Sequence, residues 1–429
     1  MKINFILTAF LLILIFPFFS YCQTNWTKYD HNPVVTKGPD NFDLIAIGQP
    51  TTLYENDTIK MWYAGVGADL KSRICYAYST DGINWIKHNT PVLDVGNNGL
   101  WDCGWLDTPE IVKDNTGYKL YYYGDTLQQF AGISSAIGVA FSTDGINWTK
   151  YSGNPIFTKG NIGEWDGTWV ESPTINFDSN IGEYKMWYNG VDTANWKINI
   201  GLATSNDGVQ WTKYANNPVL TTGNWGTYDD MWLGTPTVSK IDSYYEIWYS
   251  ATSSNSYNFG TSSFDTVSIC YAISSDGIAW TKYSNNPLFN TYTLPFDSLV
   301  DIGGPWAPCV LYNPNTNNYM MWFEAHGGNA NYSFSLATAP KINTNIAEHN
   351  RIDFIVFPNP MRFSTTIRSE ELLKNSTLQI FNSIGQTVLF RERVNGKEIE
   401  INRGNLNSGI YLLQVINNGK NLTTKLLIE

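Results

Sequence analysis

The stretch DGINWTKYSGNP, from Asp144 to Pro155, decides the fold because near-copies of it occur at four other places in the chain. Three full copies begin at Asp81, Asp207 and Asp276, and a truncated copy begins at Asn25. The Asp-Gly pairs of the four full copies are separated by 63, 63 and 69 residues. A period of this kind indicates a repeat architecture, in which one small unit occurs several times.

Each period holds four strand-like runs. Around Asp207 these runs are SPTINF, YKMWYNG and INIGLATS before the Asp-Gly pair, and VQWTKY after it. Asp-Gly favours a tight hairpin because both residues tolerate positive φ. Four antiparallel strands per repeat predict the blade of a β-propeller, so the predicted fold class is all-β.

Four complete periods and the remaining pieces make five blades. The last blade has three strand-like runs before Pro340 but no fourth, whereas an unpaired fourth strand lies around Trp26. Pairing this N-terminal strand into the last blade closes the ring and removes the exposed edges. We therefore predict a five-bladed propeller over residues 23–340. Its motif tryptophans should pack between blades, with five sugar-stacking platforms as the alternative; they are Trp26, Trp85, Trp148, Trp211 and Trp280.

Composition and the N-terminus indicate an exported globular protein. The chain has 429 residues, 43% of them hydrophobic and 15% charged, and a net charge of −11. A protein that binds duplex nucleic acid needs basic patches, which this sequence lacks, so nucleic acid is not an expected partner. Residues 1–22 read as a signal peptide with an apolar run from Phe5 to Phe19, and cleavage after Cys22 would leave Gln23 first. A membrane anchor and a lipid anchor on Cys22 are the alternatives.

The C-terminal part differs from the repeats. All 17 tryptophans lie between Trp26 and Trp322, so we expect a linker at residues 341–353 and a small Ig-like β-sandwich at residues 354–429. This tail resembles the C-terminal sorting domain of type IX secretion in Bacteroidetes, in FPNP (Phe357 to Pro360), IFNSIGQTV (Ile380 to Val388), LNSGIYLLQV (Leu406 to Val415) and the terminal KLLIE. The resemblance implies the type IX secretion machinery as a partner and a secreted or outer-surface location. An Ig-like accessory module is the alternative.

Differences between the blades point to functional residues. Each blade begins with an aromatic-Asp pair, of which Asp43 belongs to the first, and we expect these recurring acids to accept backbone hydrogen bonds in the loop before the inner strand. Two residues before the proline that follows, the five blades carry Gly48, Asp107, Glu171, Gly234 and Trp306. Inner strands converge on the propeller axis, so Asp107 and Glu171 should face one cavity. Such a pair suits glycoside hydrolysis, in which one carboxylic acid protonates the leaving oxygen and another carboxylate activates water or attacks carbon. Capping of the strands is the alternative.

The propeller resembles the five-bladed furanosidase-type glycoside hydrolases, families 43, 32 and relatives. VESPTI at Glu171 is similar to their third-blade general-acid motif, and LDTPEI at Asp107 to the second-blade Asp that tunes it. Gln49 stands where these families have a first-blade Asp, and Asp43 is the nearby acid. The resemblance implies Glu171 as general acid, Asp107 as its partner and Asp43 as base. In family 43 style the reaction inverts, with acid and base roughly 6.5–9.5 Å apart.

Further residues are candidates for sugar and metal binding. In a column of the second strands, Asn189 and Glu324 replace Ala64, Gly124 and Ser250, and Asp125 and His326 follow closely. Trp105, Trp169 and Trp232 share a column beside the inner strands and are candidates for stacking on sugars. The resemblance implies that a fifth-blade His such as His326 can hold a structural calcium on the propeller axis, with a hydrogen-bonded wall residue as the alternative. No cofactor is required.

The leading hypothesis is a secreted, monomeric glycoside hydrolase that acts on an extracellular polysaccharide or oligosaccharide. A non-catalytic surface protein, which binds carbohydrate or another cell through the same cavity, is the competing hypothesis. A phosphorylase on a similar propeller is the third, but it expects basic residues for phosphate, and no Arg or Lys stands beside the candidate motifs.

Overall fold

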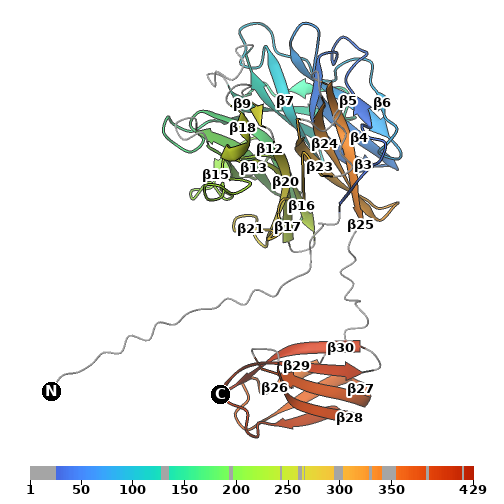
Figure 1. Ribbon diagram of the computed structural model, residues 1–429, viewed down its shortest axis with the longest axis vertical. Helices are drawn as coiled ribbons and strands as arrows, with labels where there is room; N and C mark the ends of the chain where they lie inside the picture. Colours follow the sequence, from blue (N-terminus) through green and yellow to red (C-terminus); the bar gives the residue numbers. More distant parts are fainter. Residues whose placement is uncertain are drawn as a thin grey trace, which may run out of the picture. The chain divides into compact units, whose positions relative to one another are not determined.

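The computed structural model describes residues 26–126, 135–192, 197–241, 244–258, 263–264, 266–293, 303–327, 331–340, 354–382, 386–417 and 420–429. The predicted signal peptide and the predicted linker lie outside these residues. The chain divides into two compact units, of which one is Cys22–Lys341 and the other contains Ile342–Glu429. Both units are built from strands (Figure 1). Among the described residues the one helix is a short 3-10 turn, η1 (Ser254–Ser256), and none is long and apolar enough to cross a membrane.

The larger unit consists of five antiparallel blades. From the inside outwards, blade 1 has β3 (Ala46–Glu55), β4 (Thr58–Val66), β5 (Ser72–Ser79) and β6 (Ile86–Lys87), and blade 2 has β7 (Trp105–Asp114), β8 (Gly117–Asp125), β9 (Ala136–Ser142), β10 (Thr149–Lys150) and β11 (Phe157–Thr158). Blade 3 has β12 (Trp169–Asp178), β13 (Glu183–Asp192), β14 (Lys197–Ser205) and β15 (Thr212–Lys213), and blade 4 has β16 (Trp232–Ile241), β17 (Tyr244–Thr252), β20 (Val267–Ser274), β21 (Thr281–Lys282) and β22 (Phe289–Asn290). A small hairpin of β18 (Tyr257–Asn258) and β19 (Ser263–Phe264) stands between β17 and β20.

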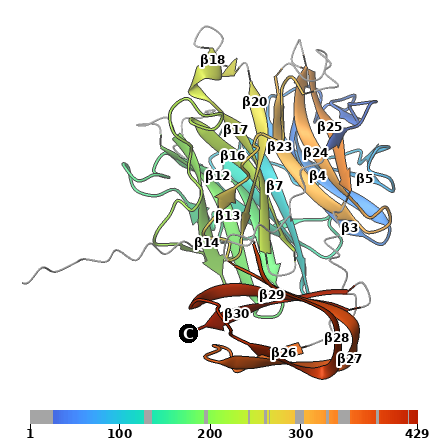
Figure 2. The same cartoon turned by 60° about the horizontal axis from the view of Figure 1, so that its bottom comes forward.

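Blade 5 joins the two ends of the propeller. It contains β23 (Pro305–Asn313), β24 (Asn318–Gly327) and β25 (Asn331–Pro340), and its outer strands are β1 (Thr27–Lys28) and β2 (Val35–Thr36) from the N-terminal side. Thr27 lies opposite Thr338, and Val35 lies opposite Phe334. The five innermost strands contact one another in order and β23 contacts β3, so the ring is closed (Figure 2). The predicted propeller closed by an N-terminal strand is confirmed.

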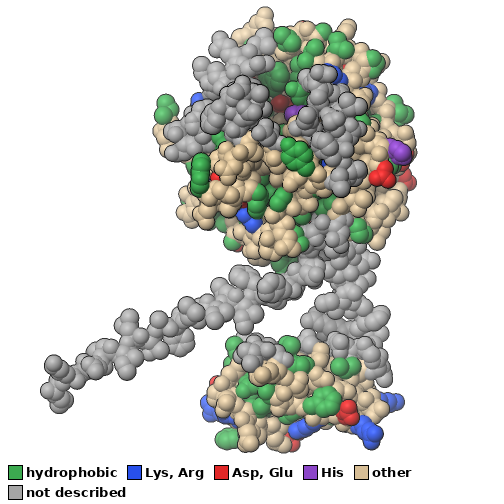
Figure 3. All heavy atoms as spheres, in the orientation of Figure 1, with side chains coloured by type: hydrophobic (Ala, Val, Ile, Leu, Met, Phe, Trp, Pro, Cys, Tyr) green, Lys and Arg blue, Asp and Glu red, His purple; other side chains and the backbone are tan. Residues whose placement is uncertain are grey.

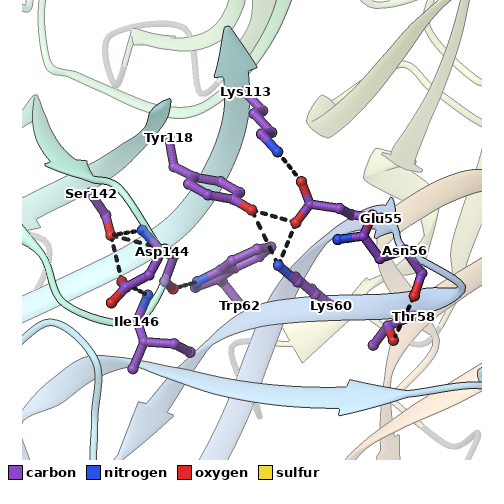
Figure 4. A network of polar contacts seen from close by, with 11 residues as sticks. Glu55, Asn56, Thr58, Lys60, Trp62, Lys113, Tyr118, Ser142, Asp144 and Ile146 are labelled. Atoms are coloured by element: carbon purple, nitrogen blue, oxygen red, sulfur yellow. Dashed lines mark hydrogen bonds and ion pairs between the residues drawn. The ribbon is translucent and has the colours of Figure 1, made fainter. Parts of the chain in front are cut away.

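In blades 1 to 4 the repeated Asp-Gly motif joins each blade to the preceding one. In blade 2 the Asp144 carboxylate accepts the backbone N–H groups of Ile146 and Asn147, both at 2.8 Å. These bonds hold the chain in a turn, so β10 contains only two residues instead of the longer strand expected. The Gly145 carbonyl accepts the indole N–H of Trp62 from blade 1 at 2.9 Å (Figure 4).

The same inter-blade bond recurs around the ring. It joins Tyr121 to Gly208, Trp187 to Gly277 and Trp322 to Gly82, with distances of 2.9, 2.8 and 2.9 Å. The motif tryptophans pack against these second-strand aromatics. Trp85 lies 5.6 Å from Trp322 and Trp280 lies 6.1 Å from Trp187, measured between ring centroids. The motif is therefore an inter-blade contact, as predicted, and its tryptophans belong to the core.

A charged cluster adds to the contact between blades 1 and 2. Glu55, at the end of β3, is bound by Lys60 of its own blade and by Lys113 and Tyr118 of blade 2 (Figure 4). These hydrogen bonds lower the pKa of Glu55 to about 2, although burial by itself acts to raise it. The neighbouring blades are thus held together by ionic contacts at this edge as well as by the aromatic core.

The smaller unit is a β-sandwich of five strands: β26 (Phe354–Phe357), β27 (Ser364–Phe381), β28 (Thr387–Asn402), β29 (Gly409–Asn417) and β30 (Lys420–Ile428). The long β27 pairs with β28, with β26 through its first part and with β29 through its last part. Apolar side chains such as Leu378, Ile380 and Leu413 are fully buried in its interior. The predicted Ig-like sandwich is confirmed as a fold.

Candidate active site

All five inner strands share one backbone device at the propeller axis. Each has a residue with positive φ directly before a proline, and the strand pairing shifts across this dipeptide. The five positive-φ residues are Gln49, Thr108, Ser172, Thr235 and Ala307, with φ between 45° and 50°. Non-glycine residues rarely adopt this conformation, and it persists only where the surrounding structure enforces it. These dipeptides line a narrow axial cavity. The residue before each dipeptide belongs to the column of Gly48, Asp107, Glu171, Gly234 and Trp306.

Asp107 holds this position in blade 2. Its carboxylate accepts the backbone N–H of Thr108 at 2.8 Å and the indole N–H of Trp105 at 3.1 Å. Burial raises the pKa of Asp107 to about 7, the two hydrogen bonds counteract the rise, and the charges of Glu324 and Glu171 add to it. The side chain is nevertheless partly accessible to solvent. Burial thus favours the protonated form of Asp107, and the partial exposure of the side chain limits this effect.

Glu171 holds the equivalent position in blade 3, so the structure brings the two predicted acids to the same level of the ring. Asn189 of β13 lies directly opposite Glu171 and is buried. Burial raises the pKa of Glu171, while hydrogen bonds with Trp169 and Asn189 counteract the rise. Asn189 and Trp169 therefore belong to the surroundings of the acid.

Glu324 supplies a third carboxylate, from β24 of blade 5. It lies opposite Trp306, its Oε2 accepts the backbone N–H of Gln49 at 3.1 Å, and its Oε1 contacts His326 Nε2. A Cβ atom placed on Gly48 would lie 3.0 Å from Glu324 Oε2. The carboxylate of blade 5 thus occupies the space that a side chain at the blade 1 position would need.

Asp43 has different surroundings from these three acids. Its buried carboxylate pairs with Lys87 at 2.6 Å and accepts the hydroxyl of Tyr63 at 3.2 Å. Three other recurring acids make the same lysine contact: Asp102 with Lys150, Asp166 with Lys213 and Asp229 with Lys282. In these acids side-chain contacts take the place of the expected backbone hydrogen bonds. Asp43 is not among the residues that line the axial cavity, and neither are Asp107, Glu171 and Glu324. The fifth pair, Phe296-Asp297, lies outside the described residues.

The remaining residues predicted to bind sugar are three tryptophans at the starts of inner strands and the buried Asp125. Trp105 and Trp169 hydrogen-bond to Asp107 and Glu171, and Trp232 holds the same strand-start position in β16. Asp125 is buried opposite Trp105 and accepts the hydroxyl of Tyr123 at 3.0 Å. The half-buried tryptophans stay predictions as sugar-stacking residues.

The sequence comparison missed two residues. Tyr123, rather than Gly124, lies opposite Asp107. The second strand of blade 2 therefore contributes Tyr123 to the column that holds Asn189 and Glu324 in blades 3 and 5. Glu110 lines the axial cavity and accepts hydrogen bonds from Thr51 Oγ1 at 3.0 Å and from the Ile175 backbone at 2.9 Å. Burial raises the pKa of Glu110 to about 7. A comparison of the residues directly after the five prolines would have identified Glu110, because the other four blades have Thr or Cys at this position.

The donor set does not fit the calcium site that the resemblance implied. Calcium takes six to eight oxygen ligands. No group of three or more His, Cys, Asp or Glu side chains suited to a metal occurs within the described ranges. His326 Nε2 contacts Glu324, and both Glu110 oxygens already accept hydrogen bonds. The hydrogen-bonded wall residue is the better description of His326.

Comparison with known proteins identifies the smaller unit. Residues 355–429 match the secretion system C-terminal sorting domain, so the protein is directed by type IX secretion to the exterior or the outer surface. The chain is 28% identical over 196 residues to an uncharacterized protein of Mycobacterium tuberculosis, a match that spans 44% of this chain and only 58% of that relative. It is also 24% identical over 242 residues to a 1,2-beta-oligomannan phosphorylase of Thermoanaerobacter, across 54% of this chain and 73% of that enzyme.

Solved structures support the fold of the larger unit. A thermostable family-43 glycoside hydrolase superposes with a TM-score of 0.52 at 17% identity, over 70% of this chain and 91% of that one. A structure from the GH130 family of mannoside phosphorylases, described as containing hydrolases of β-1,2 mannosidic linkages, gives a TM-score of 0.56 at 18% identity, over 73% and 93% of the two chains. The propeller therefore has the fold of these glycosidase-type enzymes.

Proposed function

We propose that the propeller is a secreted glycoside hydrolase that cleaves an extracellular polysaccharide or oligosaccharide by acid/base hydrolysis. The observation that supports this proposal is that Asp107, Glu171 and Glu324 come from three different blades, and that the charges of Glu324 and Glu171 contribute to the raised pKa of Asp107. Acid/base hydrolysis needs one carboxyl group that keeps its proton and one that has lost it. Unequal surroundings of neighbouring carboxyl groups produce this difference.

The surroundings favour one assignment of roles. Glu171 is the general acid, because burial favours its protonated form, and Asp107 is the neighbouring carboxyl that tunes it. Glu324 is the base in place of Asp43. A backbone N–H and His326 both lie against its oxygens, whereas the charge of Asp43 is compensated by Lys87. Blade 5 thereby contributes the carboxylate that blade 1 lacks.

Hydrolysis fits the site better than phosphorolysis, the reaction named for one relative. A phosphate co-substrate is bound by cations and aimed N–H donors. Among the described contacts of the three carboxylates, His326 is the one side chain that can carry a positive charge. Among the side chains that Figure 3 shows in colour on this face of the propeller, Lys and Arg stand singly. Water is therefore the proposed acceptor.

The test is sugar release by the full secreted chain from arabinan, xylan, fructan, β-1,2-mannan and algal glycans, with and without phosphate. We expect phosphate-independent release that Glu171→Gln and Glu324→Gln each reduce by at least about 100-fold, the scale of general acid/base catalysis. Release that requires phosphate and yields a sugar phosphate would replace hydrolase with phosphorylase. Glycan binding without release, in the same panel, would favour the non-catalytic surface protein.

Asp43→Asn and Asp166→Asn form a matched control pair. Both acids are buried, and each pairs with the lysine of its own outer strand. If Asp43 is only structural, the two variants lose similar stability and keep the same fraction of activity. If Asp43→Asn loses turnover that Asp166→Asn keeps, while both variants are folded to the same extent, Asp43 is the base.

A further inference from the structure

A belt of inter-blade contacts surrounds the propeller axis. It is built mainly by the residues directly after the five axial prolines, which are Thr51, Glu110, Thr174, Thr237 and Cys309. The Val238 N–H of blade 4 donates to Thr174 Oγ1 of blade 3 at 3.1 Å. Thr237 Oγ1 donates to the Pro308 carbonyl of blade 5, and Cys309 Sγ lies 3.2 Å from Thr52 Oγ1 of blade 1. Among the described contacts at this level, each of these three seams has one, and it joins uncharged groups.

Glu110 makes the belt different at the two seams of blade 2. Its Oε2 accepts the hydroxyl of Thr51 in blade 1 at 3.0 Å. Its Oε1 accepts the Ile175 backbone N–H at 2.9 Å and the Thr174 hydroxyl at 3.3 Å, both from blade 3. One side chain thus joins three blades. A threonine at this position has a single side-chain oxygen on a shorter side chain, so it does not accept all three donors.

The strand that Glu110 holds is β12, which carries Glu171. Ile175, whose N–H donates to Glu110, stands four residues after Glu171. On the other side of Pro173, the Ser172 N–H donates to Thr108 Oγ1 at 3.2 Å. Ser172 directly follows Glu171, and Thr108 directly follows the blade 2 acid. The inner strand of blade 2 therefore binds the inner strand of blade 3 on both sides of its proline.

Two other seams bind the corresponding N–H group in a different way. The Ala307 N–H donates to Ser250 Oγ at 3.0 Å, and the Gln49 N–H donates to Glu324 Oε2 at 3.1 Å. Both acceptors stand on the second strand of the preceding blade, not on its inner strand. In the described contacts, a direct hold on both sides of the proline thus occurs between the two strands that carry Asp107 and Glu171.

We propose that Glu110 is a positioning residue, which fixes the spacing between Asp107 and Glu171 by holding the inner strand of blade 3 against that of blade 2. This inference rests on the proposed function, because acid/base hydrolysis requires two carboxyl groups at a set spacing. A misplacement of about 1 Å can cost about 100-fold in rate. Glu110 acts through the backbone of β12 and takes no part in the proton transfers.

Two substitutions of Glu110 in the full secreted chain test this role. Glu110→Thr introduces the residue that blades 1, 3 and 4 carry, so it suits the fold, but it loses the reach to Ile175. Glu110→Gln keeps the length of the side chain and one oxygen for the Ile175 N–H.

Glu110→Thr should lower kcat by about 10- to 100-fold with little change in KM, and Glu110→Gln should restore most of kcat. Thr237→Val is the control, because it removes an uncharged contact at the seam between blades 4 and 5. It should keep kcat at the same folded fraction. Equal kcat values in Glu110→Thr and Glu110→Gln, or an equal loss in Thr237→Val, would overturn the proposal.

A measurement without sugar separates this inference from the hydrolase proposal. NMR of the full chain labelled at the aspartate carboxyl carbons follows the titration of Asp107, with Asp107→Asn to assign the signal. The charge of Glu171 contributes to the raised pKa of Asp107, so a wider spacing should lower that pKa. Both substitutions remove the charge of Glu110, so a lower pKa of Asp107 in Glu110→Thr than in Glu110→Gln reports the spacing.

The outcomes of this titration are distinct from those of the sugar-release assay. Equal pKa values of Asp107 in the two variants would overturn the positioning role, even if the wild type hydrolyses a glycan. If the wild type releases no sugar while the two pKa values differ, the hydrolase proposal fails and the positioning of Asp107 and Glu171 by Glu110 stands.

Discussion

Glu55→Gln should loosen the contact between blades 1 and 2 in a way that depends on pH. The substitution keeps the shape of the side chain but removes the charge that Lys60 and Lys113 compensate. The charged form of Glu55 is favoured in the folded protein, because hydrogen bonds from Lys113, Lys60 and Tyr118 outweigh the effect of burial. Figure 4 shows these three side chains around the Glu55 carboxylate.

The size of the effect follows from the pKa. A value lowered from 4.5 to about 2 corresponds to about 3 kcal/mol of stabilisation when Glu55 is ionised. Lys113 is 44% exposed, so solvent screening reduces the expected loss to about 1–2 kcal/mol. Because the folded pKa is the lower one, this stability is complete above the unfolded pKa. It disappears as the pH falls through the folded pKa.

Denaturant unfolding followed by tryptophan fluorescence measures this loss in the full chain. All 17 tryptophans belong to the propeller, so the signal does not report on the sorting domain. Glu55→Gln should be less stable than the wild type by about 1–2 kcal/mol at neutral pH, and the difference should shrink at about pH 3. Glu183→Gln is the matched control, because Glu183 lies 3.9 Å from Lys185 in a weaker pair. A difference that stays constant between the two pH values would refute the assignment to the Glu55 charge.

Two further outcomes follow from the described contacts. Trp187→Phe should cost about 1 kcal/mol more than Trp248→Phe in the same unfolding assay, because Trp187 donates to Gly277 whereas the Trp248 indole has no hydrogen-bond partner among the described residues. Equal costs would contradict the inter-blade hydrogen bond as a source of stability. The rate of the proposed hydrolysis should decline as the pH rises through about 7, where Asp107 loses its proton. Trp105→Phe should move this decline to higher pH, because the indole N–H of Trp105 favours the ionised form of Asp107. An unchanged pH profile in Trp105→Phe would show that the protonation of Asp107 does not control the reaction.

Comparison of the repeats predicted part of the candidate site. Asp107 and Glu171 were found because they share one column in which the other three blades carry glycine or tryptophan. The same comparison identified Asp43 as a recurring residue, but the family resemblance gave it the role of base. Its lysine partner is more than forty residues away, and the pairing becomes visible only when the outer strand is folded back against the loop.

The sequence by itself determined the blades, the closing strand and the sorting domain, because each depends on local patterns of turns, alternating side chains and a fixed period. Only the tertiary structure decided that Glu324 reaches the space beside Gly48. Gln49 and Glu324 are 275 residues apart and become neighbours when the ring closes. A repeat pattern is the same at every seam, so it does not specify which side chain of one blade fills the space left empty by the next. That choice depends on side-chain length and packing in the closed ring.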